Sequence, residues 1–467
     1  MSVLAMKFGG TSVGSSAAIA QLSTIVNAQY QEWQQVLVVV SAMSGVTDML
    51  ITGATAAARG DRTSAKSAAE ALRARHRQTL IELAGEGADT AQVSNEIEAL
   101  IGEFELLTQS VSVLGEASPR AMDAISSLGE RMSVRLVAAT LRASGRPAVA
   151  IDASEVVLTS AEFGNAAPLY PQTRERIQAR ILPLFAQGIT PVITGFIGAT
   201  EQGAVTTLGR GGSDYSGAIF GEALDADMVD IYTDVDGVMT TDPRLVSNAQ
   251  VLPNLSYAEM GELAYFGAKV LHPKTIRPVI ERGIPIRIRN TFNPSHTGTL
   301  VTRQSAPSDR AIRAVTVIRN MNLITVEGRG MIGVQGIAAR TFGAVSDAGA
   351  NVLMISQASS EQSICFVIPN SSSTAVVTTL EQSLRHEIER GDIDRIKSRT
   401  DVVIVTVVGV GIHERPGVAA KVFGAIAHAN VNILVIAQGS SECSISIVVA
   451  ANDADHAVKA LHELALE

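Results

Sequence analysis

The sequence predicts an α/β protein in which a mostly parallel β-sheet lies between helices and is followed by two small ferredoxin-like α+β repeats. Three observations predict this fold. Short β-branched runs alternate with helix-length segments over residues 1–301, residues 336–368 resemble residues 417–449, and a polar stretch, TRQSAPSDR (302–310), separates the two parts. A chain of 467 residues with 46% hydrophobic content is long enough for two or three domains with sizeable cores.

Six apolar runs predict strands of the sheet. In chain order they are VLAMKF (3–8), VLVVVSA (36–42), PAVAI (147–151), TPVITGF (190–196), MVDIYTD (228–234) and IPIRIRN (284–290). Helix-length segments between several of these runs favour parallel pairing, with helices on both faces. Residues 61–145 break the alternation, because they are rich in Ala, Glu and Arg and place apolar residues at helical spacing. We therefore expect a helical excursion over 61–145 within a first domain that spans 1–301.

The second part contains an internal repeat with a constant offset of 81 residues, from 336 to 417. Each copy reads as a strand, a glycine-containing loop, a helix and two further strands. A single unit of this kind exposes too much apolar surface, so we expect the copies to pair with each other or with another subunit. The predicted boundaries are 302–315 for the linker, 316–395 for the first repeat and 400–467 for the second.

Composition excludes several classes of protein. A net charge of −9 without basic runs disfavours binding to nucleic acid or to an anionic membrane. Two cysteines, Cys365 and Cys443, form neither a metal cluster nor a disulfide framework, and they fit a reduced compartment. The apolar runs are too short to cross a bilayer, and Lys7 interrupts the first of them before a signal peptide could form. These features predict a cytoplasmic protein without a metal site of its own.

The first glycine motif, KFGGTSVGSS, follows the first predicted strand. Lys7 stands before the glycines, whereas the lysine of a P-loop stands after them. A lysine at a strand end can direct its charge at a phosphoryl group, and Gly9 and Gly10 allow backbone N–H groups to approach phosphate closely. The alternative is a plain strand-to-helix turn with a serine as the helix cap.

The second glycine motif is LGRGGSDYSG (208–217). Arg210 is flanked by small residues, and its guanidinium suits a bidentate hold on a carboxylate. Ser213 and the neighbouring glycines offer further donors, and Asp214 can orient a lysine or a hydrated cation. The alternative is a tight turn in which Asp214 interacts with the dipole of the following helix.

Four further stretches carry candidate site residues. Glu130 in SLGERMSVRL lies at a helical position. It is either a site residue or an exposed helix glutamate. VSAMSGVTD (40–48) follows a predicted strand. It forms either a part of the site or an ordinary polar loop. YTDVDGVMTTDPR (232–244) lacks the ligand spacing of a calcium loop. It forms either a part of the site or two consecutive surface turns. AYFGAKVLHP (264–273) contains Lys269, whose alternative is a helix lysine extending along the surface.

Together, KFGGTSV, GRGGSDYS and the paired repeats resemble the aspartate kinase family, and the repeats resemble ACT domains. The resemblance covers nearly the whole chain. Within the family the resemblance is nearest to threonine-responsive enzymes. Their first regulatory repeat carries a LISQ-SSE-SI string similar to residues 353–364. The given residues include no stretch that resembles a homoserine dehydrogenase domain, so we expect the monofunctional form.

The resemblance implies a role for each candidate residue. Lys7 would neutralise the transferred phosphoryl group, and Asp214 would organise that lysine. Substrate aspartate would contact Ser41, Thr47, Glu130, Arg210 and Ser213, with Arg210 on the α-carboxylate and Glu130 on the α-ammonium. ATP would contact Gly9, Gly10, Ser12, Thr233, Asp234, Arg244 and Lys269. Met239 stands where many members carry an aromatic residue, which leaves the adenine contact open.

The implied reaction moves the γ-phosphoryl group of ATP to the β-carboxylate of L-aspartate, giving 4-phospho-L-aspartate, the first step toward lysine, threonine and methionine. The carboxylate is already an anion at neutral pH, so the reaction needs no general base. It needs charge neutralisation, which Lys7, Lys269 and Mg²⁺ held through the nucleotide phosphates would supply.

The repeats imply feedback inhibition by an amino acid, with threonine the first expectation and lysine the second. The expected effector contacts are Asn351, Gln357, Asn432 and Gln438, whose amides suit a small zwitterion. Alternatively, these side chains close the repeat fold. We expect a homodimer or homotetramer formed through the repeats. Two other functions remain open: a catalytically silent amino-acid sensor, and a kinase for another small carboxylate.

Overall fold

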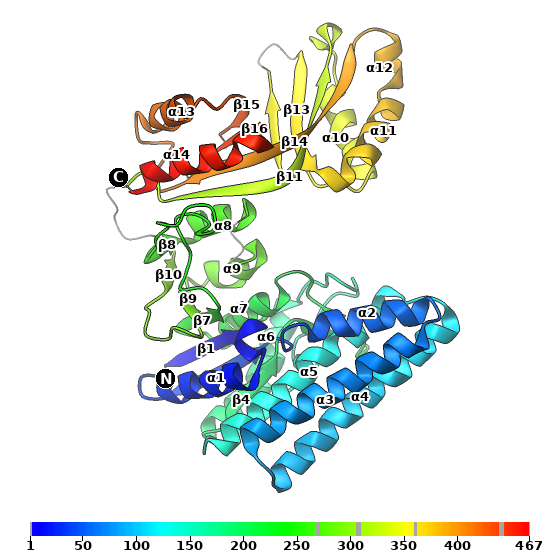
Figure 1. Cartoon of the computed structure of the whole chain (residues 1–467), viewed down its shortest axis with the longest axis vertical. Helices are drawn as coiled ribbons and strands as arrows, with labels where there is room; N and C mark the ends of the chain where they lie inside the picture. Colours follow the sequence, from blue (N-terminus) through cyan, green and yellow to red (C-terminus); the bar gives the residue numbers. More distant parts are fainter. Residues whose placement is uncertain (1, 268–270, 305–309, 359–361, 439–442, 467) are drawn as a thin grey trace. The chain divides into compact units, whose positions relative to one another are not determined.

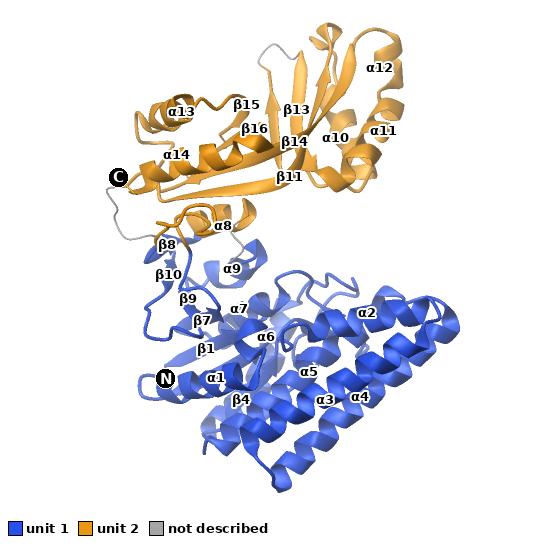
Figure 2. Ribbon diagram, in the orientation of Figure 1, with its two compact units in different colours: residues 1–238, 251–257, 269–305 blue, residues 239–250, 258–268, 306–467 orange. Residues whose placement is uncertain are grey.

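The structure is a computed structural model that describes residues 2–267, 271–304, 310–358, 362–438 and 443–466. The chain forms two compact units, coloured separately in Figure 2. Unit 1 comprises residues 1–238, 251–257 and 269–305, and unit 2 comprises residues 239–250, 258–268 and 306–467. Two short segments from the first part of the chain therefore belong to the second unit.

Unit 1 is built on an eight-stranded sheet with the strand order β3-β4-β2-β1-β7-β9-β10-β8 (Figure 1). Its strands are β1 (Val3–Phe8), β2 (Gln35–Val40), β3 (Ala148–Ile151), β4 (Thr190–Thr194), β7 (Met228–Thr233), β8 (Asn254–Ser256), β9 (Ile286–Asn290) and β10 (Thr299–Thr302). All neighbouring pairs are parallel except β9 and β10. The six strands predicted from the sequence are confirmed, each within two residues of the predicted start.

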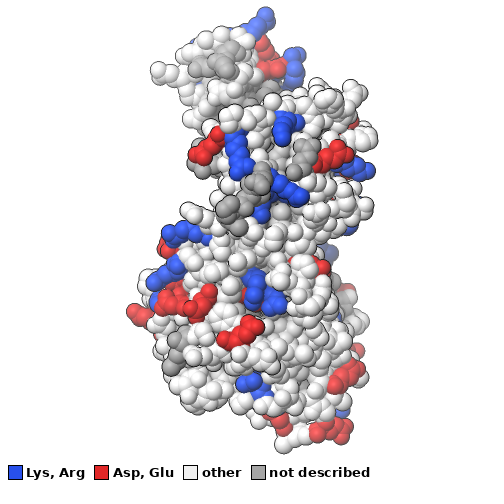
Figure 3. Space-filling view, turned by 90° about the vertical axis from the view of Figure 1, so that its left-hand side faces the viewer, with Lys and Arg blue, Asp and Glu red and all other residues white. Residues whose placement is uncertain are grey.

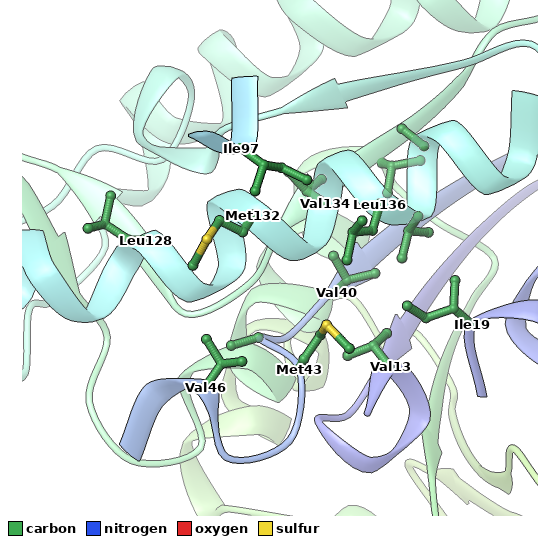
Figure 4. Close-up of a cluster of buried hydrophobic side chains, with 14 of the residues drawn as sticks. Val13, Ile19, Val40, Met43, Val46, Ile97, Leu128, Met132, Val134 and Leu136 are labelled. Carbon is green, nitrogen blue, oxygen red and sulfur yellow. The ribbon is translucent and has the colours of Figure 1, made fainter. Parts of the chain in front are cut away.

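Helices cover both faces of this sheet. They are α1 (Ser16–Gln29), α2 (Val46–Ala58), α3 (Arg62–Ala84), α4 (Ala88–Leu114), α5 (Pro119–Ala143), α6 (Tyr170–Ala186), α7 (Gly212–Ala223) and α9 (Pro273–Ile280), with short 3₁₀ turns η1 (Thr11–Val13) and η2 (Ala153–Glu155). The helical excursion predicted over 61–145 is confirmed as α3, α4 and α5. Its apolar stripe packs into one core with β1, β2 and α1, and Figure 4 shows Met132, Val134 and Leu136 of α5 in this core.

The alternation of side chains along β1 decides which face of the sheet carries its lysine. Leu4, Met6 and Phe8 belong to the core on the side of α1 and α5. Lys7 therefore points to the opposite face, because successive strand residues alternate. There α7 lies close to the strand, since a Cβ atom on Gly217 would stand 2.9 Å from Cβ of Lys7.

Some elements of unit 1 were not predicted. β10 pairs antiparallel with β9 and parallel with β8, so the edge of the sheet is mixed. A separate hairpin, β5 (Ile197–Ala199) with β6 (Val205–Thr207), precedes the second glycine motif. These strands are three or four residues long, too short for a periodic sequence signal.

Unit 2 contains a six-stranded antiparallel sheet with the order β12-β13-β11-β14-β16-β15. Its elements are α8 (Tyr257–Tyr265, whose first residue belongs to unit 1), β11 (Ala314–Glu327), η3 (Arg329–Met331), α10 (Ile337–Asp347), β12 (Met354–Gln357), β13 (Ser363–Pro369), η4 (Asn370–Ser372), α11 (Ser373–Ser383), α12 (Arg385–Glu389), β14 (Arg395–Val408), α13 (Val418–His428), β15 (Ile433–Ala437), β16 (Ser444–Ala450), η5 (Ala451–Asp453) and α14 (Ala454–Leu466). The strand-helix-strand-strand order predicted for each repeat is confirmed. Each copy also continues into a helix that the sequence reading did not include.

The two central strands of unit 2 serve both repeats. The first half of β11 pairs with the end of β14, and Val315 lies in the core of the second repeat with Val403 and Val405. The second half of β11 pairs with β13, and Ile324 lies in the core of the first repeat. The repeats are therefore joined through a continuous sheet.

The segments 239–250 and 258–267 pack against the second repeat within unit 2. Leu245 and Val246 contact its core. The Thr240 hydroxyl and Nε2 of His462 are 2.8 Å apart, and both residues are buried. Nη1 of Arg313 lies 3.4 Å from the fully buried Glu259 carboxylate. A buried ion pair of this kind is costly to break from one side, so it fixes α8 to the sheet.

On the face drawn in Figure 3, acidic and basic side chains are interspersed among wide uncharged areas. Across the described residues, the structure has no helix that combines the length and apolar character needed to cross a membrane.

Candidate active site

The centre of the candidate site is an ion pair between Lys7 and Asp214. Lys7 is 6% exposed at the end of β1, and its ammonium contacts Oδ1 of Asp214 in the first turn of α7. Two glycines bring this helix close, because Gly217 faces Lys7 and a Cβ on Gly221 would stand 2.4 Å from Val229 on β7. The structure thus joins two residues that lie 207 positions apart, from 7 to 214.

The loop after β1 is held against neighbouring strand ends. Gly9 donates its N–H to the Tyr232 carbonyl over 3.0 Å, at the end of β7. Ser12 is fully buried, and its hydroxyl accepts a 2.7 Å hydrogen bond from the Thr291 hydroxyl just after β9. Gly10 begins the 3₁₀ turn η1 without a side-chain cap. Ser12 therefore braces the loop from inside, while Gly9 and Gly10 are half-buried.

Glu130 lies on the buried face of α5. It is 4% exposed, and burial raises its pKa to about 8, with a backbone hydrogen bond from Ala42 and the charge of Lys7 opposing that rise. Its Oε2 atom has no hydrogen-bond partner among the described residues. A buried, unpaired carboxylate oxygen is costly, so this atom is suited to receive a cationic group from a ligand.

The loop after β2 reaches Glu130 through a close contact. A Cβ atom on Gly129 would stand 2.8 Å from Cβ of Ala42, so α5 packs tightly on this loop. Ser41 donates its N–H to the Phe8 carbonyl over 3.2 Å, and it is half-buried. Thr47, also half-buried, stands in the first turn of α2. Ser41 thus lies in the loop that contacts Glu130 through Ala42, and Thr47 lies at the start of the helix that follows this loop.

The second glycine motif forms the loop between β6 and α7. Gly209 and Gly211 have φ values of 75° and 72°, which favour glycine, and Gly211 directly precedes α7. Arg210 between them is exposed and forms no ion pair with any described residue. Ser213 packs on Gly195 at the end of β4. The arginine is therefore presented at the same sheet edge as Lys7, with its guanidinium available.

The predicted nucleotide residues divide between the two units. Thr233 and Asp234 follow β7 in unit 1, and the Thr233 hydroxyl donates to the Asp234 carboxylate over 3.1 Å. Arg244 belongs to unit 2, where its guanidinium pairs with the Asp242 carboxylate at 2.6 Å. Lys269 lies outside the described residues.

The predicted effector residues lie beside the two edge strands of unit 2. Asn351 and Gln357 stand before and at the end of β12, and Asn432 and Gln438 stand before and after β15. All four are exposed. The structure brings the members of each pair to one strand. The two strands stand at opposite ends of the strand order, yet they lie close together, because Met354 of β12 and Val435 of β15 belong to one apolar cluster.

Sequence reasoning missed three residues close to the site. His272 caps the N-terminus of α9 and lies against Gly211, and burial and then the charges of Lys274 and Arg210 lower its pKa. Phe292 is 55% exposed and directly follows Thr291. Asp123 is buried against the strand that leads into the Arg210 loop. The contact partners of Asp123 are distant in sequence. Among the three residues, only His272 had a local signal, because the proline that follows it marks a helix boundary.

The described residues include no group of three or more His, Cys, Asp or Glu side chains that could hold a metal ion. The carboxylates at this edge of the sheet, Asp214 and Asp234, come from separate elements.

Comparison with known proteins identifies two families in the chain. Residues 2–290 match the amino acid kinase family, and residues 324–384 and 405–464 match the ACT domain. The chain is 33% identical to lysine-sensitive aspartokinase 3 of Escherichia coli over 466 residues, which cover 98% of each protein. It is 40% identical to the chloroplastic bifunctional aspartokinase/homoserine dehydrogenase of Daucus carota, covering 98% of this chain but about half the length of that relative.

Two solved structures of E. coli aspartokinase III cover the whole chain. The complex with aspartate and ADP in the R-state matches with a TM-score of 0.83 and 32% identity. The complex with lysine and aspartate in the T-state matches with a TM-score of 0.78 and 33% identity.

Proposed function

Because this chain belongs to the amino acid kinase family and, within it, to the aspartokinases, we propose that it transfers the γ-phosphoryl group of ATP to the β-carboxylate of L-aspartate. The observation that carries the proposal is the Lys7–Asp214 pair at a sheet edge that also presents the free Arg210 guanidinium and the buried Glu130. An amino-acid substrate needs one cationic and one anionic contact, and these two residues supply them.

In this proposal the chain's own residues position charged groups and do not act as general acids or bases. Arg210 binds the α-carboxylate of aspartate, and Glu130 accepts hydrogen bonds from its α-ammonium group. Lys7 balances negative charge on the phosphoryl group in transit, and Asp214 keeps the ammonium in place. The N–H of Gly9 is bonded to the Tyr232 carbonyl, so the phosphates would approach the other backbone N–H groups of this loop. Such positioning of two reactants can account for a large part of the rate enhancement.

Mg²⁺ fits this site as a companion of the nucleotide. The ion prefers oxygen ligands and usually binds through one or two carboxylates together with substrate phosphates. Asp214 is engaged by Lys7, whereas Asp234 is exposed and suits an outer contact to the ion or its waters. When bound, Mg²⁺ would neutralise charge on the phosphates.

We place the nucleotide base near Phe292. Its N–H donates to Oδ1 of Asn290 over 2.9 Å, and the amides of Asn290 and Asn293 both donate to Asp236, over 2.8 and 3.1 Å. The loop is thus braced on both sides of an exposed ring. Thr291 links it to Thr233 through a 2.9 Å backbone hydrogen bond and to Ser12 of the glycine loop. An aromatic side chain on a rigid loop is suited to stack on a base.

Replacing Phe292 with alanine should raise the KM for ATP about tenfold, because stacking on one base contributes about 1–3 kcal/mol. The KM for aspartate should change less than about twofold. Inhibition by ADP and by pyrophosphate provides the control, since pyrophosphate lacks a base. Weaker inhibition by ADP with unchanged inhibition by pyrophosphate supports the assignment, and an equal change for both contradicts it.

We further propose that an amino-acid effector binds at the edges of the unit 2 sheet and acts on the kinase site, with threonine favoured over lysine. The segments 239–250 and 258–267 provide a physical route, because the first of them follows β7 and Thr233 within six residues and both are packed into the regulatory unit. The Glu259–Arg313 pair would transmit a shift of the sheet to α8.

The same edges would hold a second copy of the chain. Ile355 on β12 and Ile436 on β15 occupy equivalent repeat positions, and they are 50% and 44% exposed. Exposed apolar edge strands favour pairing with another chain. Ile355→Asp should therefore lower the molecular mass measured by light scattering to that of a smaller assembly. Leu182→Asp replaces a similarly exposed residue on α6 and should leave the mass unchanged; equal masses for both variants and wild type would contradict this interface.

The function is tested by incubating the protein with ATP, Mg²⁺ and L-aspartate in the presence of hydroxylamine, which traps an acyl phosphate as a hydroxamate. Aspartate-dependent hydroxamate together with ADP release is expected. Adding threonine or lysine identifies the effector by its inhibition. The prediction of a cytoplasmic protein stays a prediction.

Two other functions give different results in this assay. A silent amino-acid sensor would bind threonine or lysine and form no hydroxamate with any acceptor. A kinase for another small carboxylate would form hydroxamate with that acceptor and none with aspartate. The free Arg210 and the buried Glu130 favour aspartate over acceptors without an α-amino group.

A further inference from the structure

Asp123 is a buried carboxylate that joins the helix carrying Glu130 to the loop carrying Arg210. It lies in the second turn of α5 and is 3% exposed. Its Oδ2 atom accepts hydrogen bonds from the N–H groups of Gly164 at 2.8 Å and Thr207 at 2.9 Å, and its Oδ1 atom accepts from the Thr207 hydroxyl at 2.8 Å. No described cation pairs with it, so these three donors satisfy the charge.

Thr207 is the last residue of β6, three positions before Arg210. Its carbonyl accepts a 2.9 Å hydrogen bond from the Ala166 N–H. The N–H, the hydroxyl and the carbonyl of Thr207 are thus all hydrogen-bonded. The next turn packs closely on the same segment, because a Cβ atom on Gly209 would stand 2.7 Å from Oδ1 of Asn165. The start of the arginine loop therefore has little freedom to move relative to Asp123.

Asp123 and Glu130 are seven residues apart on α5, which places them on one face of the helix at a separation of about 10 Å along its axis. One helix face thus holds the anchor of the Arg210 loop and the Glu130 carboxylate. Gly129 also packs this helix on the loop that carries Ser41.

We propose that Asp123 is a positioning residue that sets the distance between Arg210 and Glu130, and thereby the fit of a substrate carrying both an α-carboxylate and an α-ammonium group. The inference rests on the proposed function, and it assigns a specificity role to a carboxylate that touches neither substrate nor nucleotide. Without the Asp123–Thr207 contacts, Arg210 could still bind a carboxylate, but its place relative to Glu130 would vary.

The test compares two neighbouring threonines. Thr207→Val removes the hydroxyl that bonds to Asp123, whereas Thr206→Val removes a hydroxyl that lies 2.7 Å from that of Thr159. Both residues are buried in the same short strand and point to opposite sides. A purely structural role predicts similar effects on thermal unfolding and on kinetics for the two variants.

The hydroxamate assay should give an aspartate KM about tenfold higher for Thr207→Val, with the KM for ATP within about twofold of wild type, because a hydrogen bond to a charged group is lost. Thr206→Val should leave both constants within about twofold. Succinate keeps the carboxylate that Arg210 binds but lacks the α-ammonium group that Glu130 binds, so it engages only one of the two residues and should inhibit wild type and Thr207→Val equally. β-Alanine lacks that carboxylate and should inhibit wild type and variant equally.

Thr207→Ser restores the hydroxyl and should restore the aspartate KM. If Thr207→Val does not fold, Asp123→Asn replaces it, because its amide oxygen can still accept both backbone N–H groups. An unchanged aspartate KM in a folded Thr207→Val protein overturns the proposal, as does an equal rise in the KM for ATP.

Calorimetric titration of aspartate in the presence of ADP separates this inference from the proposed function. Wild type that binds aspartate without forming hydroxamate, together with weakened binding in Thr207→Val, would reject the kinase activity and keep the positioning role. Hydroxamate formation that Thr207→Val does not alter would keep the activity and reject the role. Wild type that does not bind aspartate would reject both.

Discussion

Replacing Lys7 with methionine should lower kcat by about 10²- to 10³-fold and change the KM for aspartate by less than about threefold. Removing one preorganised donor to a developing charge has effects of this size, equivalent to about 2.7–4 kcal/mol. Lys7 is buried to 6% exposure and contacts Asp214, so solvent cannot replace its charge. Steady-state kinetics with the hydroxamate assay measures both constants, and a selective loss of kcat indicates an interaction made in the transition state.

The control for this prediction addresses stability. Lys7→Met leaves the partly buried Asp214 carboxylate without its partner, which alone could destabilise the protein. The double variant Lys7→Met/Asp214→Asn removes that unpaired charge and should regain thermal stability without regaining kcat. Recovery of kcat in the double variant would show that Lys7 acts through stability and would reject its catalytic role.

Glu130→Gln should abolish the pH dependence of aspartate binding. Burial raises the pKa of Glu130 to about 8, so its carboxyl group is mostly protonated at pH 6 in the free protein. An α-ammonium group requires the ionised form, so the aspartate KM of wild type should fall by up to about tenfold per unit as the pH rises from 6 toward 8. The glutamine variant should show a high, flat KM across this range.

The same shift predicts how stability depends on pH. A carboxyl group whose folded-state pKa is raised binds more protons in the folded protein than in the unfolded chain, so its protonation stabilises the fold below the unfolded pKa. That contribution is lost as the pH rises from about 4.5 toward 8. The free energy of unfolding, measured with urea, should therefore fall with pH more steeply in wild type than in Glu130→Gln. Parallel pH profiles would contradict both the raised pKa and the binding role.

Local sequence was sufficient for the elements that carry the site. β1 is a run of apolar residues that ends at two glycines, and its alternation places Lys7 opposite the core. Helical spacing predicted α3 to α5, and self-similarity at a fixed offset predicted the two repeats. These signals arise from side-chain periodicity within one segment, and a single sequence contains them in full.

The tertiary structure decided the features that join distant segments. The bonds between Asp123 and Thr207 span 84 positions, and no local pattern distinguishes Asp123 from any other helix aspartate. The shared strands β11 and β14, and the packing of residues 239–250 into unit 2, follow from pairing between residues far apart in the chain.

The sequence by itself thus determined the fold class, the glycine loops and the charged residues available for the reaction. Only the tertiary structure decided that burial raises the pKa of Glu130 to about 8, that Ser12 faces inward, and that Phe292 stands exposed beside the strand ends. The physical reason is that burial, pKa and hydrogen-bond partners depend on which distant residues surround a side chain. A linear pattern specifies each residue's own chemistry, while the folded chain specifies its surroundings.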